Sequence, residues 1–139
     1  MAFKFAFRES GGAPTILDLV AKDTETLTKG DLANLETGEI DLAATNDSAL
    51  VGVILETKSH TAATTTAKCI VDADAVYSVV DNNARAAGAT LDVSGATGAQ
   101  TVATSSNKDL IVVRKSSATE PTLVSINRHS HWYAGTAVS

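Results

Sequence analysis

Two histidines separated by a single residue are the side chains best spaced for chemistry in this chain. In an extended segment His129 and His131 share one face, about 7 Å apart at ~3.4 Å per residue, which is compatible with one shared metal ion. The other candidate ligands are His60, Cys69 and scattered carboxylates, and they follow no diagnostic spacing. We therefore expect no metal site and no cofactor, and we interpret the two histidines as solvated or interface residues.

A second pattern, Asp72-Ala73-Asp74, imitates the paired carboxylates of some metal-dependent sugar transferases. The pair lies between two strand-like segments, 67–71 and 76–80, so we interpret it as the turn of a hairpin. The sequence has no Gly-x-Ser-x-Gly motif, no phosphate-binding glycine loop and no histidine beside a plausible nucleophile. It therefore predicts a protein without catalytic residues, which is not an enzyme.

Charge and composition narrow the class of protein further. The net charge of −5 and the pI near 5.0 disfavour nucleic-acid binding, which needs a basic surface to displace counterions from phosphates. No apolar run approaches the ~20 residues that cross a membrane, and Met1 to Arg8 lacks the apolar core of a secretory signal. The single cysteine, Cys69, forms no intrachain disulfide, and we expect it to be a small buried residue on a strand. We expect a product made in the cytoplasm and no membrane partner.

Short apolar segments separated by Gly, Asn and Asp predict an all-β fold, either a barrel or a sandwich. The most apolar segment, 49–56, has the pattern of a strand buried on both faces, with Gly52 marking a bulge or a close backbone approach. One short helix is predicted over 84–87, capped by Asp81-Asn82-Asn83 and ended by Gly88. The other predicted strands are 15–20, 38–43, 67–71, 76–80, 90–93, 100–103, 110–114 and 123–126.

The aromatic residues gather at the two ends of the chain, where five of the six are found. Rings alternate with other residues over Phe3 to Arg8, and Gly11-Gly12-Ala13-Pro14 follows as a hinge, so 1–14 is predicted to be an extended N-terminal arm. The alternative is a first strand of the same body. Residues 15–139 are expected to form a single domain with a C-terminal interface segment. The expected interface residues are Phe3, Phe5, Phe7, Arg8, Trp132 and Tyr133.

The core predicted by this composition is thin. Ala and Thr make up 41 of the 139 residues, and small side chains bury little surface. A thin core gains its missing burial from neighbouring subunits. We therefore expect an oligomer.

Several segments together resemble a known family. They are Lys29-Gly30-Asp31-Leu32, Gly38 to Leu42 and Ala49 to Leu55, with looser likeness over 83–93 and 107–113. In these segments the chain resembles the head decoration proteins of tailed bacteriophages, which are also called capsid-stabilising or cement proteins. The Phe-rich N-terminus and the Trp132-Tyr133 end depart from that family.

The resemblance implies a compact β-barrel of the β-tulip kind, commonly a homotrimer, with an N-terminal arm that lies against the capsid. It implies the major capsid protein as partner and the outer surface of the expanded head as location, after synthesis in the host cytoplasm. The implied function is to stabilise the head against internal DNA pressure. Two alternatives stay open. One is a receptor- or carbohydrate-binding β-module that uses Trp132, Tyr133 and the histidines for stacking, and the other is a structural protein of the phage tail or of head completion.

Overall fold

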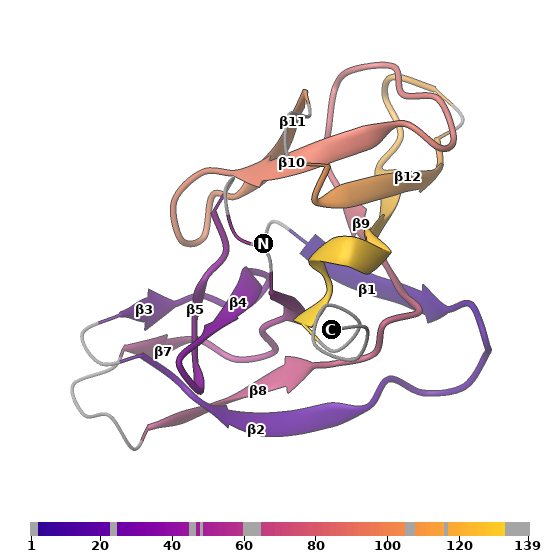
Figure 1. Cartoon of the computed structure of the whole chain (residues 1–139). Helices are drawn as coiled ribbons and strands as arrows, with labels where there is room; N and C mark the ends of the chain where they lie inside the picture. The colour runs from indigo at the N-terminus through magenta and orange to yellow at the C-terminus, as the bar shows by residue number, and fades with distance from the viewer. Residues whose placement is uncertain are drawn as a thin grey trace.

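The computed structural model describes residues 3–22, 25–44, 47, 49–59, 65–104, 108–115 and 117–132. The chain is all-β, with 52% strand and 3% helix. The strands form antiparallel sheets (Figure 1). The largest sheet has the order β1 (Phe3–Arg8), β9 (Ala75–Val79), β13 (Thr122–Ile126), β12 (Leu110–Arg114), β10 (Thr90–Ser94) and β11 (Thr101–Thr104).

Three smaller sheets complete the described part of the chain. One is three-stranded, in the order β5 (Glu39–Leu42), β4 (Leu32–Glu36) and β6 (Leu50–Val53). The other two are the pairs β2 (Ile16–Val20) with β8 (Thr66–Ile70) and β3 (Thr26–Leu27) with β7 (Lys58–Ser59). In the view of Figure 1, β10 and β12 lie at the top, whereas β2 and β8 form a two-stranded ribbon along the lower rim.

Two hydrophobic clusters hold these sheets together. We call the larger the sheet core: Phe3, Leu32, Ala43, Leu50, Val53, Ile70, Ala75, Tyr77, Val79, Leu91, Val93, Val102, Leu110, Val112, Val124 and Ile126. We call the smaller the ribbon core: Ala21, Leu27, Ala33, Ile40, Val51, Ile54, Ala67 and Cys69. Strand β6 contributes side chains to both clusters and is buried throughout. The prediction of a central strand within 49–56 is therefore confirmed.

Gly52 lies where β6 meets the strands of both clusters. A Cβ atom at this position would be 1.9 Å from the carbonyl oxygen of Ile70 and 2.7 Å from the hydroxyl of Tyr77. Neither distance is compatible with a side chain, so the predicted close backbone approach is confirmed. Ile70 belongs to β8 and Tyr77 to β9, so at this residue β6 lies close to both the ribbon and the largest sheet.

The predicted hairpin of 67–71 and 76–80 is wrong. The two segments do form strands, but β8 pairs with β2 whereas β9 pairs with β1 and β13. The connection through Asp72 and Asp74 therefore carries the chain from one sheet to another. Both carboxylates accept hydrogen bonds from the segment that links β1 to β2, so they join separate elements and close no hairpin.

The predicted helix over 84–87 is also wrong. Gly88 donates its N–H to the carbonyl of Val112, and Val112 donates to Ala89, so the chain here extends the ladder that leads into β10. Four residues close at most one helical turn, and a first turn is unfavourable without apolar packing. The described helical segment is instead a 3₁₀ turn at Arg128–Ser130.

The structure also corrects the expectation that the N-terminal segment is an extended arm. Phe3–Arg8 is β1, the outermost strand of the largest sheet, and it pairs with β9 along its length. The N–H of Phe3 donates to the carbonyl of Gly30 at 2.9 Å, and the ring of Phe3 is buried in the sheet core. The alternative, a first strand of the same body, describes this segment correctly.

Candidate interaction surface

The three N-terminal rings, expected on one face, have three different environments. Phe3 is buried, and Phe5 is half-buried with its ring edge-on to Tyr77, at 6.5 Å between centroids and 75° between planes. The register of β1 shifts between Phe5 and Phe7, which breaks the alternation of side chains. Phe7 is consequently 43% exposed and is the most exposed of the three rings.

Arg8 anchors the end of β1 to the connection between β8 and β9. Its guanidinium lies 3.0 Å from Asp74 and 3.6 Å from Asp72. Asp74 also accepts hydrogen bonds from the hydroxyl and the N–H of Ser10, while Asp72 accepts one from the N–H of Thr15 at 2.6 Å. The Ser10 hydroxyl, together with Arg8, lowers the pKa of Asp74 to about 2. Arg8 is therefore committed to contacts within the chain.

Of the C-terminal candidates, Trp132 lies against the ribbon core. Trp132 is half-buried, and its ring centroid is 6.3 Å from that of His131. His131 is buried beside β6, where it forms a parallel bridge with Leu50, and burial lowers its pKa. His129 is exposed. The 3₁₀ turn ends the extended geometry that would have put His129 and His131 on one face.

Tyr133 and His60 lie outside the described residues. Tyr133 therefore stays a predicted interface residue, as part of the C-terminal segment that begins with Trp132.

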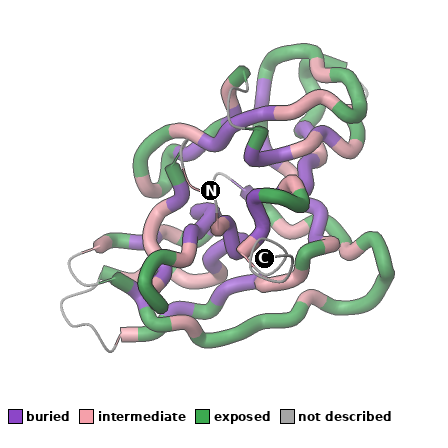
Figure 2. The backbone as a smooth tube through the Cα atoms, in the orientation of Figure 1, coloured by how far each residue is buried: buried purple, intermediate pink, exposed green. Residues whose placement is uncertain are grey.

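The exposed apolar surface that the sequence reasoning missed lies on β2. Ile16, Leu17 and Val20 are 46%, 43% and 36% exposed, and Figure 2 shows this strand as a mostly exposed run along the lower rim. The one sequence feature that marks it is an apolar run interrupted by Asp18, a pattern shared with buried strands. Nothing in that pattern says whether a second face is covered.

Asp18 stands in the middle of this exposed strand, opposite Lys68 of β8. Their charged groups are 3.0 Å apart, and the hydrogen bond to Asp18 raises the pKa of Lys68. The ion pair is exposed and contributes little to stability. The pair does place one negative and one positive group side by side on the solvent-exposed face of β2 and β8.

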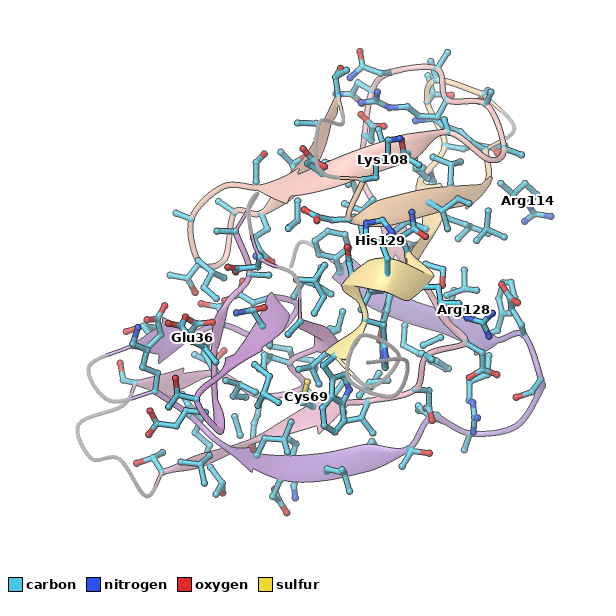
Figure 3. The ribbon with its side chains drawn as sticks, in the orientation of Figure 1. Glu36, Cys69, Lys108, Arg114, Arg128 and His129 are labelled. Atoms are coloured by element: carbon cyan, nitrogen blue, oxygen red, sulfur yellow. The ribbon has the colours of Figure 1, made fainter. Side chains whose placement is uncertain are left out.

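The buried titratable groups are held in forms unsuited to nucleophilic chemistry. Burial raises the pKa of Cys69 to about 12, so its thiol stays protonated. In Figure 3 Cys69 lies within the lower half of the molecule, while Arg114 points outward. Burial raises the pKa of Tyr77 and also that of Asp109, which reaches about 6. Across the described ranges, no group of three or more His, Cys, Asp or Glu side chains is arranged to hold a metal ion.

Two hollows on the surface are small compared with ligand sites. One has about 120 Å³ and lies beside β1, lined by residues that include Phe3, Phe5 and Lys29. The other has about 210 Å³ and is lined by residues that include Arg114 and Glu120. Pockets for small molecules begin at roughly 300 Å³. The exposed strands are therefore better candidates for binding than either hollow.

Comparison with known proteins finds no protein-family model that matches the chain and no curated protein similar to it in sequence. The part of the chain that the structure describes contains no helix with the length and apolar character to span a membrane.

Proposed function

We propose that the protein is a structural decoration protein that binds the outer surface of an expanded phage capsid and stabilises it against internal DNA pressure. The observation that carries this proposal is a pair of edge strands, β1 and β2, each with exposed apolar side chains. A protein that acts by contact needs such edges and needs no catalytic pocket. The resemblance in Lys29 to Leu32, Gly38 to Leu42 and Ala49 to Leu55 supports the same class.

The capsid contact is assigned to β1. This strand is the outermost of its sheet and exposes Lys4 and Phe7. An edge strand offers backbone groups to a partner strand, and its side chains fill pockets on the partner, which is β-augmentation. The partner in this proposal is the major capsid protein. Trp132 and Tyr133 are the second contact, whereas Phe3 and Phe5 support the strand from within.

Stabilisation follows from mass action. A protein that binds the assembled shell and not its separate subunits lowers the free energy of the shell, and repeated weak contacts over a lattice add up. The proposal includes a closed arrangement of the four sheets, as a β-barrel of the β-tulip kind, and a homotrimer seated on the assembled shell. It also includes a location on the outer surface of the virion head, after synthesis in the bacterial cytoplasm.

The test is co-sedimentation with empty expanded phage heads, with unexpanded heads and a glycan panel as comparisons. We expect retention by the expanded heads alone. Phe7→Ala is expected to weaken that retention about tenfold, equivalent to ~1.4 kcal/mol, while changing the free energy of unfolding by less than about 1 kcal/mol. Val80→Ala is the matched control, because Val80 is exposed and apolar but lies outside both edge strands. Retention by glycans and not by heads would overturn the proposal in favour of a carbohydrate-binding module.

A further inference from the structure

The outer edge of β2 presents backbone groups that no other described strand uses over most of its length. The carbonyl of Thr15 accepts from the N–H of Val71 at 3.1 Å, and the N–H of Ala21 donates to Thr65 at 2.8 Å. These two bonds fix the phase of the ladder, so the odd-numbered residues of β2 bond to β8. The N–H and C=O groups of Ile16 and Asp18 therefore point away from β8.

Strand β5 covers this outer edge only at its far end. Ala21 bridges Ile40, and the N–H of Lys22 donates to the carbonyl of Ile40 at 2.9 Å. In the part of the chain that the structure describes, no strand pairs with the outer side of β2 before this bridge. An uncovered edge with apolar side chains is a template for another strand.

The side chains along this edge alternate between two faces. Ile16, Asp18 and Val20 share the outward face with Lys68, whereas Leu19 packs against the ribbon core. Leu17 shares the inner face with Leu19 but lies at the end of the ribbon, where it is left exposed. The edge therefore offers apolar contacts on both of its faces.

We propose that β2 pairs with β2 of a second copy of this chain, antiparallel and about a two-fold axis at Leu17. In this register each Ile16 lies opposite Asp18 of the other copy, and each of these two pairs exchanges both of its N–H···O bonds. The two Leu17 side chains meet at the axis, in a position without hydrogen bonds where cross-strand side chains are closest. The two ribbons then form one four-stranded sheet.

Charge and backbone chemistry select this register over its neighbours. A pairing centred on Asp18 puts the two Asp18 carboxylates directly opposite each other, and like charges so placed are destabilising. A pairing centred on Ile16 puts Pro14 opposite Asp18, and proline has no N–H to donate. The register centred on Leu17 keeps the two carboxylates apart and gives both central pairs, Ile16 with Asp18, their N–H donors, while Pro14 lies opposite Val20, outside these pairs. It also leaves the ion pair between Asp18 and Lys68 in place.

Crosslinking tests the register directly. Because Leu17 lies opposite Cys69 on β8, the Leu17→Cys and Val80→Cys variants are both made together with Cys69→Ala, so that the new thiol has no cysteine partner in its own chain. In Leu17→Cys the thiols of the two copies would then meet at the axis, at a separation close to that of a disulfide. We expect mild oxidation to give a covalent dimer of twice 14.3 kDa, at least tenfold more than in Val80→Cys, whose position is 71% exposed but lies away from β2. The unaltered protein should give none, because Cys69 is buried. Equal crosslinking of the two variants would overturn the pairing.

Sedimentation tests the contact without a crosslink. The unaltered protein should shift from 14.3 kDa toward twice that mass as concentration rises. Asp18→Pro removes an outward N–H and spares the bonds to β8, so it should stay monomeric. Leu17→Lys leaves the backbone unchanged and puts two positive charges at the axis, so it should also stay monomeric even if the proline variant fails to fold.

Pairing of two β2 strands and binding of the capsid are independent of each other, so the experiments distinguish a failure of one from a failure of the other. A concentration-independent mass of one copy, or dimers that persist in Leu17→Lys, would overturn the β2 pairing while leaving capsid binding untested by that result. A mass of three copies unaffected by Leu17→Lys would overturn it too, and would favour the homotrimer of the proposed function.

Discussion

The first two strands of the chain are both edge strands, yet they differ in whether their apolar side chains are buried or exposed. Strand β1 buries Phe3 in the sheet core, whereas β2 leaves Ile16 and Leu17 exposed. Strand β1 belongs to a six-stranded sheet and packs against β6, while β2 belongs to a ribbon of two strands. The comparison shows that burial here depends on what covers a strand, and the hydrophobicity of the strand itself does not decide it.

The two strands also differ in the contacts that hold their ends in place. Side chains hold β1 at its end, through Arg8 and the carboxylates of Asp72 and Asp74. Strand β2 is held by its ladder to β8 and by the bridge at its far end. An element with few side-chain contacts and one covered edge is the better candidate for pairing with another chain.

The largest expected effect is at Gly52, where the two regions meet. Gly52→Ala puts a Cβ atom 1.9 Å from the Ile70 carbonyl oxygen, so backbone must move in β6 or β8. We expect the free energy of unfolding to fall by at least about 4 kcal/mol, measured by urea denaturation. Gly38→Ala is the control, because Gly38 has φ +81° and open space around it, so it bears only the backbone cost of about 1 kcal/mol. Equal losses in the two variants would mean that the regions are not in rigid contact.

The next effect separates the buried ring of β1 from the exposed one. Phe3→Ala should lower the free energy of unfolding by about 3 kcal/mol, because it opens a cavity in the sheet core. Phe7→Ala should change it by less than about 1 kcal/mol, since Phe7 already faces solvent. Both are measured by chemical denaturation. If the two losses were equally small, β1 would be detached in solution and the expectation of an arm would return.

The smallest effect concerns a buried carboxyl group of the largest sheet. Asp109 is almost fully buried, and burial together with the nearby Asp92 raises its pKa from 3.8 to about 6. The native state therefore keeps this proton to higher pH than the unfolded chain does. Stability from this group is full below about pH 4 and is lost as the pH rises through 6. Between pH 4 and pH 7 the free energy of unfolding of the unaltered protein should therefore fall by about 2 kcal/mol more than that of Asp109→Asn.

Comparing how the free energy of unfolding depends on pH in the unaltered protein and in Asp109→Asn separates the contribution of Asp109 from those of other carboxyl groups. Asp41 also has a pKa raised to about 6 by burial, and Asp81, held by Arg85, has one lowered to about 2. Both remain in Asp109→Asn, so their contributions cancel in the difference. Asp41→Asn should show the same sign with a smaller size, because Asp41 is half-buried and lies 3.9 Å from Lys22. Parallel curves for Asp109→Asn and the unaltered protein would contradict the expectation.

The sequence by itself located most of the strands. Alternation and turn residues place β2, β5 and β8 to β13 within a residue or two, and they place β6 with an end three residues too late. Gly52 is predicted to mark a bulge or a close backbone approach, and the structure shows the close approach. Strand β4 is not among the predicted strands. The two-residue strands β3 and β7 were missed, because two residues carry no periodicity.

The candidate surface was predicted less well. The rings of Phe3 and Phe5 were expected to face a partner and instead pack inward, while the exposed residues Ile16 and Leu17 were assigned to the body. Phe7 and Trp132 remain accessible at least in part. Several aromatic side chains in a segment indicate that it packs against another surface. They do not indicate whether that surface belongs to the same chain or to a partner.

Only the tertiary structure decided which strands pair. The sequence placed strands on both sides of Asp72 to Asp74 and favoured a hairpin, yet β8 joins β2 and β9 joins β1. Local periodicity gives a strand two faces and two edges, and it carries no information about what meets them. Those choices are made by contacts between residues far apart in the chain, such as Gly52 with Ile70 and Phe3 with Gly30. The covered face of β1 and the open edge of β2 both follow from them.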